Sequence, residues 1–164
     1  MKKETQFSVI LTNVPGELSK LCAVLKAANI NILAMTIQNA KDSVKELYNI
    51  KIKTKSRMEM EASYRGILRE SSNYSLIRIL VDKAEECEKV LTKAEYLFDK
   101  DHVLVLKLAN IPGTLGKVAE IFGNADVNID YVYGSSIEES QDANYIVHVA
   151  EADIKKLKDA LKDF

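Results

Sequence analysis

Two short stretches of the sequence place an amide side chain and backbone N–H groups where they could bind a small anion. Residues 13–18 read NVPGEL and residues 110–115 read NIPGTL. In each stretch a β-rich run ends and an apolar pattern of helical spacing begins. The first N–H groups of a helix have no partner within the helix and carry partial positive charge, which favours a carboxylate. Each corner could therefore hold an anion.

Proline and glycine suit such a corner for different physical reasons. Proline presets φ near the helical value and lacks an N–H that the first helical turn would leave unpaired, which predicts Pro15 and Pro112 in that turn. Glycine has no Cβ, so Gly16 and Gly113 would let a ligand approach the backbone closely. The alternative is that each corner only turns the chain, with its asparagine satisfying local backbone groups.

The two corners belong to a longer internal repeat. Residues 13–32 align without a gap with residues 110–129. After each corner, apolar residues recur at i, i+3, i+4 and i+7, which is one face of an amphipathic helix. They are Leu18, Leu21, Cys22 and Leu25 in the first copy, and Leu115, Val118, Ala119 and Phe122 in the second.

The elements that must position the corners follow the same order in both halves. Strands are predicted before the corners at 6–12 and 102–108, and after the helices from 31 and from 128. Further strands are predicted at 76–81, near 94–98 and at 145–149. A capping-box-like pair, Asp82 and Glu85, begins a helix with Ala84, Cys87 and Leu91 inward. The last helix presents Ile154, Leu157 and Leu161 on one face.

This order predicts an α+β fold made of two ferredoxin-like βαββαβ units, each an antiparallel sheet with both helices on one face. We expect domains at 1–99 and 100–164, divided at the polar residues 99–101, with an insertion around 42–73. The second domain apparently lacks its last strand, and the open sheet edge would invite pairing.

A second interpretation of the first half stays open. It makes 46–53 the third strand, 57–70 the second helix and 74–81 the last strand, and it leaves 82–99 as an appended helix and strand.

Composition excludes several classes of protein. The net charge of -1 gives no general field for a polyanion, so nucleic acid is not the expected partner. No signal-peptide core or membrane-length apolar run is present in the sequence, which predicts a cytoplasmic chain without membrane contact. Cys22 and Cys87 have no metal or disulfide spacing and are expected to be buried apolar side chains.

Other candidates for chemistry are weak. His102 and His148 lie in strand runs without a nucleophile nearby in sequence and are interpreted as sheet histidines. Tyr131 and Tyr133 suit packing across a sheet, or could line a pocket. Lys51, Lys53, Lys55 and Arg57 fit a solvated basic face better than an anion site. We therefore expect no catalytic residues, no metal and no cofactor.

The pattern N-x-P-G-x-L, a helix and then N-I, repeated within βαββαβ units, resembles the ACT domain, a small-molecule-sensing module of amino-acid metabolism. Two such units without a catalytic domain resemble the free-standing tandem ACT proteins. In that family an effector amino acid binds between units, against the first loop of one and the second strand of a neighbour. The resemblance therefore implies a ligand site at a domain or subunit interface.

The resemblance implies contacts from the loop and from the second strand of each copy. Paired amides supply donors and acceptors that can orient the ammonium and carboxylate of a zwitterion. The second-strand asparagines could instead end the preceding helix. The candidate ligand-binding residues are Asn13, Val14, Pro15, Gly16, Leu18, Asn31 and Ile32 in the first half, and Asn110, Ile111, Pro112, Gly113, Leu115, Asn128 and Ile129 in the second.

One departure from the family bears on the ligand. Serine-sensing members carry a histidine two residues before the loop asparagine, whereas Leu11 and Leu108 stand there in this sequence. Recognition of serine by that group is therefore in doubt, and a pocket beside these leucines would suit a branched or aromatic amino acid. We expect a non-enzymatic regulatory protein, a homodimer or higher oligomer that modulates a metabolic enzyme. The alternative is a ligand-free assembly subunit built on the same sheets.

Overall fold

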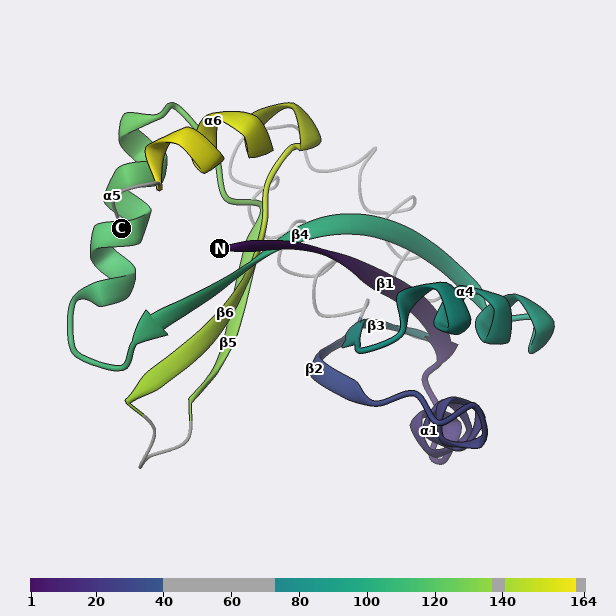
Figure 1. Ribbon diagram of the computed structural model, residues 1–164. Coiled ribbons are helices and arrows are strands. Elements are labelled where there is room, and N and C mark those ends of the chain that lie inside the picture. Colours follow the sequence, from purple (N-terminus) through teal and green to yellow (C-terminus); the bar gives the residue numbers. More distant parts are fainter. Residues whose placement is uncertain (40–72, 137–140, 162–164) are drawn as a thin grey trace, which may run out of the picture. The chain divides into compact units, whose positions relative to one another are not determined.

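A computed structural model describes residues 1–39, 73–136 and 141–161 of the chain (Figure 1). The fold is α+β, with helices and antiparallel strand pairs. The elements are β1 (Lys2–Thr12), α1 (Glu17–Ala27), β2 (Ile32–Asn39), β3 (Tyr74–Val81), α4 (Ala84–Lys93), β4 (Leu97–Ala109), α5 (Thr114–Asn124), β5 (Tyr131–Ser136), β6 (Asp142–His148), a 3-10 turn (Glu151–Asp153) and α6 (Ile154–Ala160).

The chain divides into two compact units. Unit 1 comprises Met1–Gln6 and Asp101–Phe164, and unit 2 comprises Phe7–Lys100. The division passes through β1 and through β4, so each of these two strands contributes residues to both units. Domains bounded at 1–99 and 100–164 stay a prediction.

Unit 2 has the strand order β2-β3-β1-β4. β2 and β3 are antiparallel, with Ile32 opposite Val81 and Asn39 opposite Ser75, and the register shifts between Ile32 and Ala34. β3 lies between β2 and β1. The third strand of a βαββαβ sheet takes this position, and the first of the two interpretations made residues 76–81 that strand. The strand at 46–53 and the helix at 57–70 of the second interpretation lie outside the described residues.

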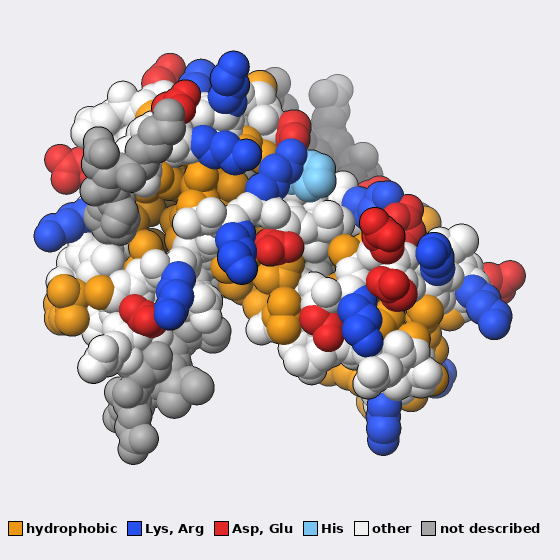
Figure 2. All heavy atoms as spheres, in the orientation of Figure 1, with side chains coloured by type: hydrophobic (Ala, Val, Ile, Leu, Met, Phe, Trp, Pro, Cys, Tyr) orange, Lys and Arg blue, Asp and Glu red, His pale blue; other side chains and the backbone are white. Residues whose placement is uncertain are grey.

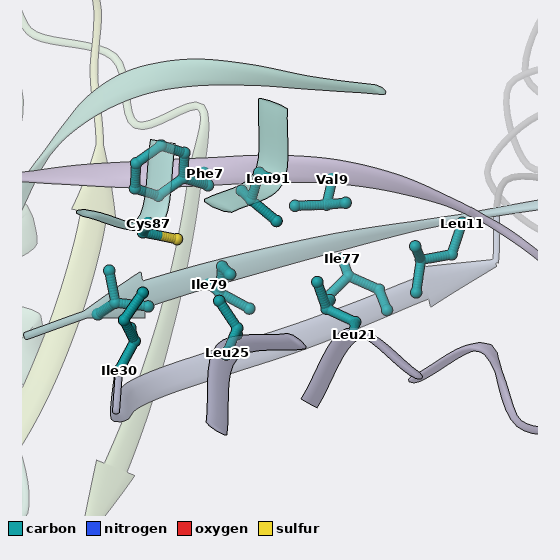
Figure 3. Packing of buried hydrophobic residues seen from close by; sticks show 11 residues of the cluster. Phe7, Val9, Leu11, Leu21, Leu25, Ile30, Ile77, Ile79, Cys87 and Leu91 are labelled. Carbon is teal, nitrogen blue, oxygen red and sulfur yellow. The ribbon is translucent and has the colours of Figure 1, made fainter. Parts of the chain in front are cut away.

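The core of unit 2 lies between its strands and the helices α1 and α4 (Figure 3). Alternate residues of β1 point inward because side chains on a strand alternate between its two faces. The fully or nearly fully buried members are Phe7, Val9, Leu11, Leu21, Leu25, Ile30, Ile77, Ile79, Val81, Cys87 and Leu91. The inward face predicted for the helix at 84–93 is confirmed, because Cys87 and Leu91 are buried and Ala84 packs against them.

Unit 1 has the strand order β1-β4-β6-β5. β6 pairs antiparallel with β4 and with β5, with Leu106 and Gly134 both opposite Tyr145. α5 and α6 cover a core of Leu104, Leu106, Leu108, Val118, Phe122, Val127, Val147, Val149, Ile154 and Leu157 (Figure 1). The sequence offered no last strand for this half, and in the structure the first residues of β1 lie beside β4 in this unit.

Several local predictions are wrong for identifiable reasons. The strands expected near 94–98 and at 102–108 form one strand, β4, because the polar residues 99–101 continue it without a turn. Asp82 does not cap α4: its side chain accepts a hydrogen bond from the backbone N–H of Asn31, and Lys83 occupies the N-cap. The predicted helix stripes are too wide, because Leu115 and Ala119 of α5 are exposed.

The two cysteines lie in different environments. Cys87 is buried in the core of unit 2 as expected, whereas the prediction for Cys22 is wrong because this thiol is exposed on α1. Burial raises the pKa of Cys87 to about 11. The thiolate is the reactive form, so native protein at pH 8 should react with a thiol reagent at Cys22 alone. Counting labelled thiols with and without denaturant checks this, and reaction at Cys87 in the native protein would contradict the packing.

Charged side chains of both signs are mixed over the face of the molecule shown in Figure 2. The surface pairs in the described residues are single contacts such as Lys107 with Asp142 at 2.8 Å and Lys100 with Glu88 at 2.6 Å. Exposed pairs of this kind contribute little to stability. This mixed surface agrees with the net charge of -1 and offers no broad field of one sign on that face.

Candidate functional site

The two Asn-x-Pro-Gly corners adopt the same backbone geometry. Gly16 has φ 96° and ψ −17°, and Gly113 has φ 91° and ψ −14°. A proline followed by a glycine with positive φ and ψ near zero is the signature of a type II turn. The Glu17 N–H donates to Val14 O at 3.5 Å, and the Thr114 N–H donates to Ile111 O at 3.3 Å.

This geometry corrects the role predicted for the prolines. Helices α1 and α5 begin one residue after the glycines, so Pro15 and Pro112 lie in the turn before the helix and not in its first turn. The glycine is the N-cap, and no side chain caps the first turn of either helix. The first N–H groups of both helices are therefore not used by a capping side chain, which leaves the arrangement that suits an anion.

The asparagine at each corner is joined to the start of a neighbouring strand. The Asn13 N–H donates to Asn73 O at 2.7 Å, and the Asn110 N–H donates to Gln141 O at 2.9 Å. Asn13 also accepts a hydrogen bond on Oδ1 from the Ser75 hydroxyl at 3.1 Å. Ser75 could not be recognised from the sequence, because it lies far from the corner along the chain. These contacts hold the backbone of both asparagines and, at Asn13, the side-chain amide as well.

Apolar side chains beside the corners differ in exposure. Val14 is 53% exposed and Ile111 is 65% exposed, although both directly precede the prolines. Leu18 packs against the core of unit 2, whereas the matching Leu115 is 37% exposed. The corner of unit 1 thus presents more apolar surface than that of unit 2. Large exposed apolar groups beside a polar loop are typical of a binding surface.

Glycine is needed at the corner because φ is positive there, and not because a side chain would lack space. A Cβ added at Gly113 would meet no atom within 4 Å, but φ there is positive. We expect Gly113→Ala to lower the free energy of unfolding by roughly 1 to 2 kcal/mol. Gly116→Ala is the matched control, because this helical glycine also has open space, and the change should stabilise by about 0.5 to 1 kcal/mol. Urea unfolding measures both, and equal effects of the two changes would refute the argument.

The second-strand candidates lie at the other end of the helix from the corner. Helix α1 has 11 residues and therefore spans about 16 Å, so Asn13 and Asn31 of one unit cannot contact the same small molecule. The same holds for Asn110 and Asn128 across α5, which also has 11 residues. A site that uses both positions needs a corner and a second strand from different units.

Asn31 and Asn128 do not end the helices. The left-handed residues after the helices are Asn29 with φ 54° and Asp126 with φ 55°. The Ile30 N–H donates to Leu25 O, and the Val127 N–H donates to Phe122 O, which with the preceding N–H bonds makes a Schellman ending. Asn31 and Asn128 are exposed, and the following Ile32 and Ile129 pack partly against the two cores. The competing helix-ending role is therefore excluded.

A buried polar network in unit 1 escaped the sequence analysis. Gln6 is fully buried, and its amide nitrogen donates to Tyr131 Oη at 2.5 Å, while Tyr133 Oη donates to Gln6 Oε1 at 2.9 Å. Tyr131 stacks on His148 at a centroid distance of 4.8 Å, and His148 Nδ1 lies 2.9 Å from Asp130 Oδ2. The tyrosines thus pack across the sheet, and the placement of His148 in a strand is confirmed.

Among the described residues, the structure offers no assembled metal site: no group of three or more histidine, cysteine or acidic side chains could hold an ion. No helix in the described part of the chain is long and apolar enough to cross a membrane.

Comparisons with known proteins concern the family and the fold. Residues 102–164 match the family model of the ACT domain, a region that contains the second corner. Protein BT0572 from Bacteroides thetaiotaomicron has a similar fold, with a TM-score of 0.71, 21% identity, and coverage of 98% of this chain and 88% of that one. A search of curated proteins gave no match.

Two further solved structures are similar in fold. The regulatory subunit of aspartate kinase from Thermus thermophilus has a TM-score of 0.54 at 13% identity, covering 98% of this chain and 96% of that one. The corresponding subunit from Thermus flavus has a TM-score of 0.56 at 10% identity, covering 99% and 92%. At these identities the likeness shows the fold alone.

Proposed function

We propose that the chain is a non-catalytic, cytoplasmic regulatory protein that binds an amino acid at its Asn-x-Pro-Gly corners and modulates a partner enzyme of amino-acid metabolism. The carrying observation is the repeated corner, in which a type II turn, an uncapped helix start and an asparagine amide occur together twice. The ACT-domain match over residues 102–164 supports this function for the second corner.

We further propose that both halves are ferredoxin-like ACT units in tandem. The strand orders β2-β3-β1-β4 and β1-β4-β6-β5 support this, because each places the strand before a corner second from an edge, as in a βαββαβ sheet. The likeness in fold to two regulatory subunits of aspartate kinase supports a regulatory role.

The proposed site is completed by a second copy of the chain. Within one unit the corner and the residues that begin the second strand lie at opposite ends of a helix, so Asn31 or Asn128 would reach the ligand from a neighbouring copy in a homodimer. A ligand held between copies favours the packing that it fits better, and this differential affinity shifts the state of the assembly. A partner enzyme that binds one packing would then respond to the amino acid.

A thermal-unfolding screen of the protein against the common amino acids tests this function. A ligand at about 100 times its dissociation constant adds roughly 2.7 kcal/mol of stability, which should raise Tm by roughly 5 to 10 °C. We expect Asn13→Ala or Asn110→Ala to abolish the shift. Asn124→Ala is the matched control, because it removes an exposed asparagine amide at the end of α5, away from the corner, and should keep the shift. A shift that survives both asparagine changes would reject the corners as the site.

A ligand-free assembly subunit is the second candidate. β2 is the outer strand of unit 2 in the described part of the chain, and it carries three exposed apolar side chains, Leu33, Met35 and Ile37. Outer strands with exposed apolar residues favour pairing with another chain. If no amino acid shifts Tm while Met35→Lys dissociates the oligomer, assembly without a ligand becomes the better explanation.

A further inference from the structure

The two Asn-x-Pro-Gly corners share their backbone geometry but differ in charge. Because φ is 96° at Gly16 and 91° at Gly113, and the same hydrogen bond closes both turns, the two corners offer similar backbone groups to a ligand. The first helical residue is Glu17 in unit 2 and Thr114 in unit 1. The first turn of α1 thus contains an acidic side chain, and the first turn of α5 contains none. A difference in anion affinity between the corners would therefore come from their side chains.

Glu17 is held at the start of α1 by an ion pair. Its Oε1 lies 2.6 Å from Lys20 Nζ, and its side chain is 19% exposed whereas that of Lys20 is 69% exposed. The hydrogen bond with Glu17 raises the pKa of Lys20, which keeps the lysine charged and paired. A carboxylate in the first turn of a helix already interacts with the partial positive charge of the first N–H groups. A second carboxylate that arrived at this corner would be repelled by the first.

Lys117, the corresponding lysine of unit 1, forms no ion pair in the described part of the chain. It is the fourth residue of α5, as Lys20 is the fourth residue of α1, and it is exposed. The ion pair of Lys107 with Asp142, at the same end of unit 1, adds no net charge. The charges at the start of α1 thus cancel, whereas the start of α5 keeps one positive charge.

We infer that the Glu17–Lys20 pair excludes an anionic group from the first corner, so that the ligand of the proposed function binds at the second corner alone. Its carboxylate is attracted by Lys117 and by the first N–H groups of α5, which no acidic side chain of the first turn shields. The ACT-domain match over residues 102–164 includes the second corner and not the first. This assignment rests on the proposed function and narrows it, because each chain then binds one amino acid and needs Asn110 but not Asn13.

Equilibrium dialysis counts the sites directly. The probes are the common amino acids in radiolabelled form, each tested on the whole protein. We expect the amino acid that binds best to saturate at one molecule per chain. Glu17→Gln removes the negative charge and leaves Lys20 unpaired, so it should open the first corner and raise saturation to two molecules per chain. Two molecules per chain in the wild type, or one in Glu17→Gln, would overturn the inference while the proposed function stands.

Thr114→Glu makes the reverse change. It places a carboxylate at the first position of α5 and should weaken binding by at least about tenfold. Thr114→Gln is the matched control, because it loses the same hydrogen bond to Ile111 O without adding a charge, and it should leave the affinity unchanged. Asn13→Ala should keep binding and Asn110→Ala should lose it. Loss in Asn13→Ala, or unchanged binding in Thr114→Glu, would assign the ligand to the first corner. If no amino acid binds to any of these proteins, the proposed function is rejected together with the inference.

Discussion

Residues 100–164, produced without the first 99 residues, should fail to form a stable domain. This piece contains both helices of unit 1 but lacks Met1–Gln6, which lie beside β4 in that unit. Without them β4 becomes an open edge, although Val103 and Leu104 are fully buried in the whole protein. A 65-residue chain has little stability to lose, so the loss of a strand should leave it unfolded. Circular dichroism and amide chemical-shift dispersion would show this.

A matched construction tests the cause. Joining residues 1–7 through a flexible linker to the end of the 100–164 piece supplies the strand after the last helix, where a βαββαβ unit has its fourth strand. This version should fold and melt cooperatively. If the piece without the added strand melts just as cooperatively, the first residues of β1 are dispensable and the division at 99/100 describes an independent domain.

Gln6→Ala should lower the free energy of unfolding by roughly 2 to 4 kcal/mol. The substitution removes a fully buried amide and leaves the hydroxyls of Tyr131 and Tyr133 without the partner they have at 2.5 and 2.9 Å. Each polar group that loses its partner in a buried site costs about 1 to 3 kcal/mol, and the vacated volume adds to this. Tm should fall by roughly 5 to 15 °C for a chain of this length.

Gln38→Ala provides the control. This glutamine is exposed on β2, and its hydrogen bond with Arg78 is long at 3.4 Å, so the change should stay within about 0.5 kcal/mol. A double-mutant cycle of Gln6→Ala with Tyr133→Phe should give a coupling energy of at least about 0.5 kcal/mol. Additive effects would mean that the hydrogen bond between the two side chains does not contribute.

The sequence predicted the features that depend on local pattern. The repeated corner, the α+β class and the inward positions Leu21, Leu25, Val118 and Phe122 follow from turn chemistry and helical spacing, and the structure confirms them. It was harder to predict which residues at the margin of a helix's apolar stripe are exposed. Cys22 and Leu115 have the right spacing but lie beyond the width that the sheet covers.

Features that depend on partners distant in sequence could not be predicted. Lys2, Lys3 and Glu4 are charged and have low β propensity, yet they form a strand because a neighbouring strand is available in unit 1. Gln6 resembles any surface glutamine until Tyr131 and Tyr133 are placed beside it. Asp82 has the spacing of a helix cap, but the backbone N–H of Asn31 competes for its carboxylate.

The division of β1 between two units also constrains the order in which the protein can fold during synthesis. The ring of Phe7 packs on Phe98 at a centroid distance of 5.8 Å, so the sheet of unit 2 cannot close until β4 has left the ribosome. Contacts between residues so distant in sequence form slowly, and a strand that stays unpaired during this time can aggregate. β1 begins with Lys2, Lys3 and Glu4, and charged side chains on an unpaired strand oppose its association with other chains. The charged residues that lower the β propensity of this segment thus protect it from aggregation until β4 has been synthesised.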